Sequence, residues 1–114
     1  MIPVSVGSIR IGGGHPLVLL AGPCVVESRE LTLRTAEAVR DIAARCGMPV
    51  VFKASYKKAN RTSGRAFTGI AMDQALAVLQ EVRSTVGLPV LTDIHAPEEA
   101  MPAAEAADIL QIPA

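Results

Sequence analysis

Aromatic side chains are scarce in this sequence of 114 residues, which has one tyrosine, two phenylalanines and no tryptophan. Because hydrophobic residues still make up 50% of the chain, its core has to be built from valine, isoleucine, leucine and alanine. That composition suits parallel strands covered by helices better than an antiparallel sandwich rich in aromatic residues. A chain of this length forms one domain with a modest core.

An excess of charge is also absent, because 11 basic residues balance 11 acidic ones. The balance argues against a nucleic acid or a membrane surface as the main partner. No apolar run approaches the roughly 20 residues of a membrane span. Residues 1–4 lack the charged and apolar regions of a signal peptide. We therefore expect a cytoplasmic protein.

Cysteine occurs only twice. Cys24 follows a predicted strand and Cys46 ends the next predicted helix, so a helix of about 17 residues separates them by roughly 25 Å, which excludes a disulfide. Cys46 belongs to an apolar stripe with Val39, Ile42 and Ala43, which predicts a core position. For Cys24 two interpretations stay open, a small buried hydrophobe or a metal-binding or reactive thiol at a strand end.

A repeated phrase organises the chain. Residues 47–51 and 87–91 share a Gly-x-Pro-Val-apolar pattern, and residues 15–20 resemble it. Glycine ends a helix in this pattern and proline opens a strand. Such repetition predicts successive βα units.

The intervening segments have helical periodicity. We predict helices over residues 29–46, capped by Ser28, and over residues 72–86, ended by Gly87. A shorter helix begins near Pro97, with Glu98 and Glu99 at the positive end of its dipole. Residues 4–11 predict a β-hairpin and residues 109–112 a last strand.

This order predicts an α/β fold with four parallel strands, either a small open sheet or part of a barrel. A complete (β/α)8 barrel needs about 250 residues, so we interpret residues 1–114 as the first half of a TIM barrel. Its N-terminal hairpin would span residues 1–14 and its βα units residues 15–114.

Polar and reactive residues follow the predicted strands. In both architectures, ligands bind at the carboxyl ends of parallel strands. The residues expected at those ends are Gly22, Pro23 and Cys24, Lys53 to Ser55, Asp93 to His95, and Gln111 to Ala114. We favour a functional role for Asp93, whereas His95 fits a functional or a surface position equally well.

A basic segment at residues 53–63 predicts an anionic ligand. Lys53 continues an apolar strand and should face the site, whereas Lys57 fits a solvated loop. Arg61 lies in a loop rich in serine, threonine and glycine, which can arrange hydroxyl and N–H groups around a phosphate. Cations and a guanidinium group match phosphate or carboxylate.

Four of these segments together resemble the 3-deoxy-D-manno-octulosonate 8-phosphate synthases: residues 21–28, 52–63, 92–95 and 111–114. The Lys-Ala-Ser-x-x-Lys-Ala-Asn-Arg segment is the most specific of them. The Gly-Pro-Cys turn also occurs in a sister family, the 3-deoxy-arabino-heptulosonate 7-phosphate synthases. That family usually has Lys-Pro-Arg-Thr where this chain has Lys58-Ala59-Asn60-Arg61-Thr62.

The resemblance implies a (β/α)8 enzyme that condenses phosphoenolpyruvate with D-arabinose 5-phosphate for the octulosonate sugar of lipopolysaccharide, releasing phosphate. It implies a homotetramer in the full-length protein. It assigns catalytic roles to Lys58, Asn60 and Asp93. The residues implied around phosphoenolpyruvate are Lys53, Ser55, Lys58, Gln111, Pro113 and Ala114. Asn60, Arg61 and Thr62 would bind the second substrate, with Arg61 reaching a neighbouring subunit's site.

A divalent metal ion is also implied. Members of the family with cysteine at the position of Cys24 depend on a metal, whereas those with asparagine there do not. The other three ligands, a His, a Glu and an Asp, would fall beyond Ala114. We therefore expect this chain alone to be inactive.

Two alternatives remain at this point. One is a heptulosonate 7-phosphate synthase, which the Lys58–Thr62 segment disfavours. The other is a non-catalytic half-barrel that binds phosphorylated metabolites and dimerises through exposed strand edges.

Overall fold

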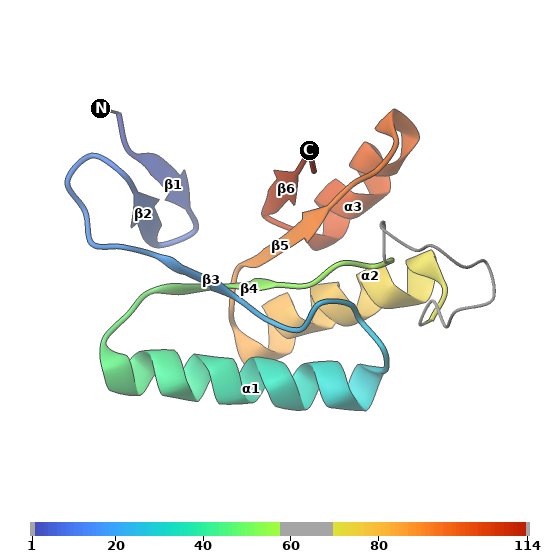
Figure 1. Ribbon diagram of the computed structural model, residues 1–114, viewed down its shortest axis with the longest axis horizontal. Coiled ribbons are helices and arrows are strands. Elements are labelled where there is room, and N and C mark those ends of the chain that lie inside the picture. Colours follow the sequence, from blue (N-terminus) through green and yellow to red (C-terminus); the bar gives the residue numbers. More distant parts are fainter. Residues whose placement is uncertain (1, 58–69, 114) are drawn as a thin grey trace.

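The computed structural model describes residues 2–57 and 70–113 and has an α/β architecture (Figure 1). Its strands are β1 (Val4–Val6), β2 (Ile9–Ile11), β3 (Leu19–Ala21), β4 (Val50–Lys53), β5 (Val90–Asp93) and β6 (Ile109–Gln111). Its helices are α1 (Arg29–Cys46), α2 (Met72–Glu81) and α3 (Ala100–Ala106). Strands β3 to β6 form one parallel sheet in chain order. The predicted α/β class with a parallel sheet is therefore confirmed.

The ends of the helices follow the sequence signals. Ser28 caps α1, its Oγ accepting a hydrogen bond of 3.2 Å from the backbone N–H of Leu31. A π-helical turn, Val82–Val86, extends α2, so residues 72–86 are helical as predicted. Gly47 and Gly87 end these two helices in the left-handed conformation, with φ of 68° and 84°, which glycine adopts without strain.

The third helix begins as a 3₁₀ turn, Pro97–Glu99, and continues as α3. Pro102 is the third residue of α3. Because proline has no backbone N–H, the helix lacks the hydrogen bond that another residue would donate there.

The core lies between the sheet and the helices, which gather on one side of it (Figure 1). Val50 and Phe52 of β4 and Val90 of β5 belong to this core together with Ala36 and Ala43 of α1. Because successive strand residues point to opposite faces, the alternate residues of each strand lie on the other face of the sheet.

Cys46 is exposed, so its predicted core position is wrong. The face that α1 buries is carried by Thr32, Ala36 and Ala43, and Ile42 beside it is also half exposed. Ile42 lies at the edge of that face and Cys46 is the last residue of the helix, so solvent reaches both side chains. Both cysteines are free, as their predicted separation requires.

Strands β1 and β2 form a separate antiparallel pair across Gly7 and Ser8. This turn lies beside Leu88, Pro89 and Asp108, which precede β5 and β6. The pair therefore lies at the amino ends of the parallel strands, away from the edge at which ligands bind in such sheets.

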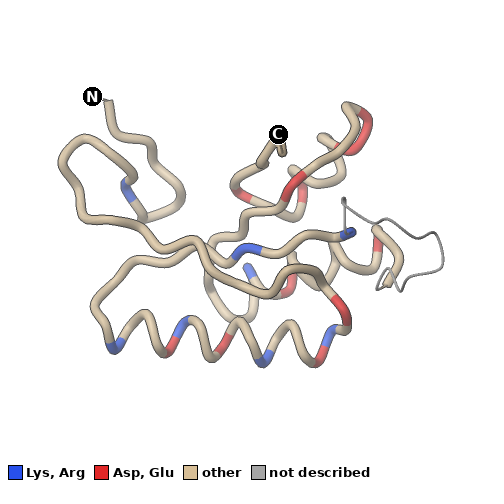
Figure 2. Tube along the Cα trace, viewed as in Figure 1, with Lys and Arg blue, Asp and Glu red and all other residues tan. Residues whose placement is uncertain are grey.

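Charges of both signs alternate along α1 (Figure 2), which is typical of a solvated helix face. None of the helices in the described residues is long and apolar enough to cross a bilayer.

Candidate functional site at the carboxyl edge of the sheet

The first side of the site is formed where β3 and β4 end. The backbone N–H of Ser55 donates to the carbonyl of Cys24 at 3.2 Å, and that of Val26 donates to the carbonyl of Ser55 at 2.9 Å. These bonds continue the pairing of the two strands beyond their last regular residues. They hold the turn at Cys24 against the segment that follows Lys53.

Gly22 permits this close approach. A Cβ atom at residue 22 would lie only 1.9 Å from the carbonyl oxygen of Lys53, so every other residue type would clash with the β4 backbone. The turn encloses a pocket of about 360 Å³, whose lining includes Cys24, Lys53 and Ser55. Three predicted site residues are thus brought together, with the exposed thiol of Cys24 beside a cation and a hydroxyl.

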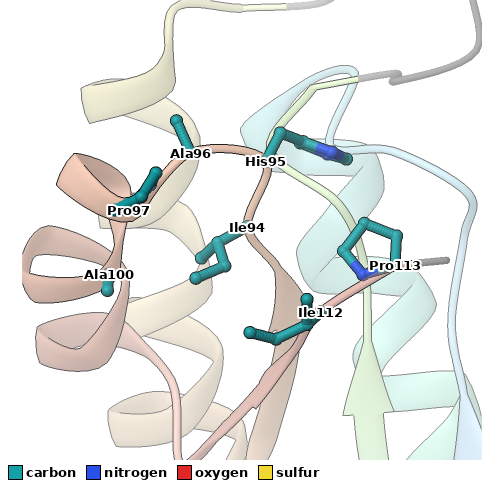
Figure 3. Close-up of a pocket in the computed structure, with 7 residues that line it drawn as sticks. All are labelled: Ile94, His95, Ala96, Pro97, Ala100, Ile112 and Pro113. Atoms are coloured by element: carbon teal, nitrogen blue, oxygen red, sulfur yellow. The ribbon is translucent and has the colours of Figure 1, made fainter.

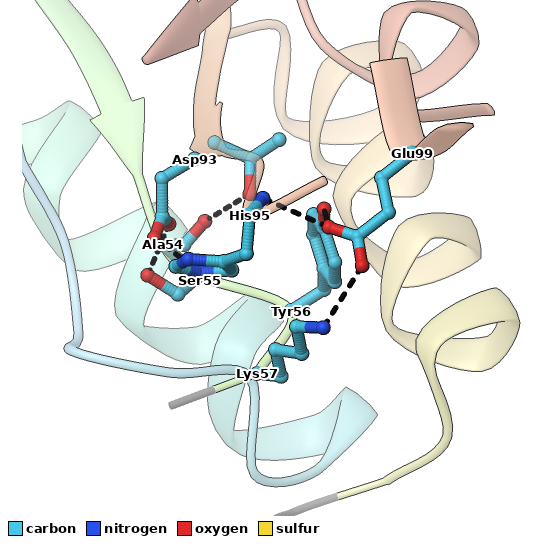
Figure 4. Close-up of polar contacts among 8 residues, drawn as sticks. Ala54, Ser55, Tyr56, Lys57, Asp93, His95 and Glu99 are labelled. Carbon is cyan, nitrogen blue, oxygen red and sulfur yellow. Dashed lines mark hydrogen bonds and ion pairs between the residues drawn. The ribbon is translucent and has the colours of Figure 1, made fainter. Parts of the chain in front are cut away.

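Asp93, the last residue of β5, joins this group through Ser55. The Ser55 hydroxyl donates a hydrogen bond to Oδ1 of Asp93 (Figure 4). On the other side of the carboxylate, Nε2 of His95 lies 3.0 Å from Oδ2, without the alignment of a hydrogen bond. The exposed fractions of the two side chains are 16% for His95 and 13% for Asp93. His95 is therefore partly buried beside Asp93 and does not lie on the open surface, and its role stays a prediction.

A buried hydroxyl fixes the register of β4 and β5 at this edge. Thr92 is fully buried, and its Oγ1 donates to the carbonyl of Ala54 at 2.8 Å. Because a polar side chain in the core needs such a partner, this bond holds Ala54 next to β5, with Ser55 directly after it.

Glu99 is the residue of this edge that the sequence did not indicate. Its Oε1 accepts hydrogen bonds from the Tyr56 hydroxyl and, at 2.9 Å, from the backbone N–H of His95. Its Oε2 accepts one of 2.8 Å from Nζ of Lys57 (Figure 4). Lys57 is therefore ion-paired, where its sequence context suggested a solvated charge.

The environment of this contact shifts the pKa values of Glu99 and Tyr56. The hydrogen bond from Lys57, followed by that from Tyr56, lowers the pKa of Glu99 to about 2. Burial first, and then the hydrogen bond to Glu99, raises the pKa of Tyr56 well above its ordinary value. Glu99 is thus ionised and Tyr56 protonated at neutral pH. The sequence predicted only that Glu99 stabilises the helix dipole, and it contained no signal for the contacts of Glu99 with Tyr56 and Lys57.

Gln111 and Pro113 lie on the side of β6. Gln111 pairs with Asp93 in the β5–β6 register, and its carbonyl accepts a hydrogen bond of 3.0 Å from the N–H of Ile94. Pro113 lines a larger pocket of about 650 Å³ together with His95, Ile112 and residues that precede or begin α3 (Figure 3). Among the described residues of that lining, His95 alone has an ionisable side chain, so an anion fits the smaller pocket beside Lys53 better.

Five predicted site residues lie outside the described part of the chain: Lys58, Asn60, Arg61, Thr62 and Ala114. Their roles stay predictions.

Similar proteins carry a consistent name. The chain is 55% identical over 111 residues to a protein of Trichlorobacter lovleyi named 2-dehydro-3-deoxyphosphooctonate aldolase, a match covering 97% of this chain and 41% of that protein. It is 52% identical over 111 residues to a protein of the same name from Geotalea daltonii, again 97% and 41% of the two chains. A third, from Acidithiobacillus ferrooxidans, is 54% identical over 100 residues, or 88% of this chain and 36% of the relative. The chain thus spans about two fifths of the length of these relatives.

The model of one protein family, described as the DAHP synthetase I family, matches residues 1–114. This match covers the whole chain, including the sheet edge at which Cys24, Lys53, Ser55 and Asp93 meet. The chain therefore belongs to the DAHP synthetase I family.

Proposed function

We propose that this chain forms the first part of an enzyme that condenses phosphoenolpyruvate with D-arabinose 5-phosphate. The products would be 3-deoxy-D-manno-octulosonate 8-phosphate and inorganic phosphate, with one water consumed, in the biosynthesis of the lipopolysaccharide sugar. The observation that carries the proposal is the grouping of Cys24, Lys53, Ser55 and Asp93 at one sheet edge. It occurs in a chain 50–55% identical to relatives named 2-dehydro-3-deoxyphosphooctonate aldolase.

The fold proposed for the full-length enzyme is a (β/α)8 barrel whose first half this chain supplies, preceded by the β1–β2 hairpin. The parallel sheet with helices on one side supports it. In such a barrel the substrates bind at the carboxyl ends of the strands, which is the edge that carries the pocket beside Lys53.

Substrate binding is a problem of charge, because both proposed substrates are multiply anionic and repel each other in water. Lys53 at the pocket offsets that charge. The Ser55 hydroxyl donates its hydrogen bond to Asp93, so its oxygen can still accept a hydrogen bond from another group. Gln111 and Pro113 would complete the phosphoenolpyruvate side, together with Lys58 and Ala114. Holding both anions in a reactive geometry accounts for a large part of the rate enhancement in condensations of this kind.

Asn60, Arg61 and Thr62 are proposed to bind the phosphate end of D-arabinose 5-phosphate. A guanidinium group grips phosphate with two parallel hydrogen bonds, which suits Arg61 to this role. In the proposed homotetramer, Arg61 would enter the site of a neighbouring subunit.

A divalent metal ion is part of the proposal. Cys24 is proposed as one ligand, and the others would have to come from outside the described residues, which contain no group of three or more His, Cys, Asp or Glu side chains placed to hold a metal. Its exposed thiol in the pocket beside Lys53 is accessible to an ion. When bound, the metal would orient the sugar aldehyde or a water molecule.

A second candidate is a 3-deoxy-arabino-heptulosonate 7-phosphate synthase, because the matching family model carries the description DAHP synthetase I, but the Lys58–Thr62 segment disfavours it. The names of the similar proteins favour the octulosonate enzyme instead. Mass spectrometry separates the two, because one product has seven carbons and the other eight.

The test uses a completed protein, in which this chain is followed by the part of the Trichlorobacter lovleyi relative that comes after the matched residues. We expect this protein, supplied with a divalent metal, to release phosphate from phosphoenolpyruvate only when D-arabinose 5-phosphate is present. We expect no turnover from the 114-residue chain alone. A completed protein that unfolds cooperatively but forms no eight-carbon product would refute the proposal, with the relative itself as positive control.

A further inference from the structure

Glu99 connects two loops of the sheet edge that are far apart in sequence. Tyr56 and Lys57, which follow β4, donate to its two oxygens, and the backbone N–H of His95, which follows β5, donates to Oε1 (Figure 4). We call these four residues the Glu99 clamp. Every donor reaches the same carboxylate, so the clamp fixes the distance between the two loops.

The carboxylate is largely withdrawn from water. The exposed fraction of the Glu99 side chain is 12%, against 45% for Lys57, and Tyr56 is 1% exposed. Removing a charge from water is costly unless several donors replace the water, and the net contribution of such a group to stability is often small. A group of this kind is better suited to holding a geometry than to adding stability.

The same two loops are also joined through Asp93, which accepts the hydroxyl of Ser55. His95 lies between the two carboxylates, with its backbone N–H on Glu99 and its imidazole Nε2 3.0 Å from Asp93. The ring of Tyr56 packs edge-on to that imidazole, at 6.5 Å between ring centres and 68° between planes. Glu99 thus places the backbone of His95 directly. Tyr56, which donates to Glu99, packs against the side chain of His95.

We propose that Glu99 is a positioning residue, which sets the placement of His95 and Asp93 relative to Ser55 across the β4 and β5 loops. It does so without touching substrate. Pairing with Glu99 also compensates the charge of Lys57, which leaves Lys53 as the cation that lines the pocket among the described residues. The catalytic part of this inference rests on the proposed condensation.

The substitution Glu99→Ala removes all three contacts, whereas Glu99→Gln keeps an oxygen that accepts from Tyr56 and His95. In the completed protein we expect Glu99→Ala to lower kcat at least tenfold, with the KM of each substrate changed less than about threefold. A misplacement of about 1 Å can cost up to a hundredfold in rate. We expect Glu99→Gln to stay within about threefold of wild-type kcat, and Tyr56→Phe to lower it about threefold.

Glu81→Ala is the matched control. Glu81 also joins two elements through a two-point contact, with Arg29 of α1, at 2.9 and 2.5 Å, and it takes no part in the sheet edge. A positioning role predicts that Glu81→Ala leaves kcat within twofold. If Glu99→Ala lowers only the melting temperature, as Glu81→Ala is expected to, and kcat per folded enzyme is unchanged, Glu99 is merely structural and the proposal is wrong.

A readout without turnover separates this inference from the proposed function. Hydrogen exchange of the His95 amide, measured in the 114-residue chain and in the completed protein, should accelerate at least tenfold in Glu99→Ala and little in Glu99→Gln. Unchanged exchange in Glu99→Ala would overturn the clamp whatever the activity. A completed wild-type protein without condensation activity would refute the function, and with it the catalytic role, while accelerated exchange would still support the clamp.

Discussion

The close approach of β3 and β4 at Gly22 leads to the strongest stability prediction. In Gly22→Ala the new Cβ would lie 1.9 Å from the carbonyl oxygen, 2.9 Å from the carbonyl carbon and 3.0 Å from the nitrogen of Lys53. Carbon atoms in contact are about 3.5–4.0 Å apart, so the strand ends must separate by more than about 1 Å. These atoms of Lys53 cannot rotate away from the new Cβ, because all of them belong to the backbone.

The cost has two parts. Overpacking of this kind costs about 1–3 kcal/mol, and more where the backbone has to move. The shift also weakens the two hydrogen bonds between Ser55 and the turn at Cys24, each contributing about 1 kcal/mol. We therefore expect Gly22→Ala to lower the free energy of unfolding by about 3–5 kcal/mol, measured by urea denaturation of the completed protein.

Gly47→Ala is the control for the loss of glycine itself. Its new Cβ would meet nothing within 4 Å, but its φ of 68° is strained for alanine, which costs about 1–2 kcal/mol. A loss in Gly22→Ala no larger than that in Gly47→Ala would refute the argument that backbone contact at Lys53 excludes a side chain. Condensation activity should fall only in Gly22→Ala, because only there does Lys53 move relative to Cys24.

Three further predictions concern the completed protein. Cys24→Ser should lose most of the bound metal, measured by elemental analysis of the purified protein, and unchanged metal content would refute the assignment of Cys24 as a metal ligand. Arg61→Lys should raise the KM of D-arabinose 5-phosphate, and Lys58→Ala should raise that of phosphoenolpyruvate. Losing a charged hydrogen bond costs about 1.5–3 kcal/mol, or roughly ten- to a hundredfold in kcat/KM. Equal small effects on both substrates would contradict the assignment of each residue to one substrate. Because the pKa of Glu99 is lowered from 4.5 to about 2, its ionisation contributes stability above about pH 4.5 that is lost as the pH falls towards 2. The stability advantage of wild type over Glu99→Gln should therefore shrink across that range in acid titrations followed by circular dichroism, and a constant difference would count against the assigned pKa.

Local signals predicted the elements of the fold well. Ser28 and the glycines at 47 and 87 delimit helices because capping depends on residues within one turn of the helix end. The apolar strands after each Gly-x-Pro phrase were also predicted from local sequence, because a strand buried on both faces is a continuous apolar run. Helix caps and apolar runs depend only on residues that are close together in the sequence, so they can be recognised without the structure.

The convergence of the strand ends was predicted from the fold class, but individual side-chain contacts between distant residues were not. Tyr56 and Glu99 are 43 residues apart, and neither has a neighbour that reveals the contact. The periodicity of α1 identified an apolar stripe, but it did not decide which flank of that stripe would meet the sheet. Cys46 and Ile42 therefore remained in solvent although they match the helical period.

One pattern links the core to the candidate site and recurs at the ends of three strands. Lys53-Ala54-Ser55, Asp93-Ile94-His95 and Gln111-Ile112-Pro113 each place an apolar residue between two residues of the site. Ala54 and Ile94 are buried in the core with the helices, so their neighbours on either side have to point to the opposite face. A shift of either strand by one residue would exchange the two sets and bury Lys53 or Asp93 against the helices. The packing that stabilises the sheet is therefore also what directs these polar side chains into a common site.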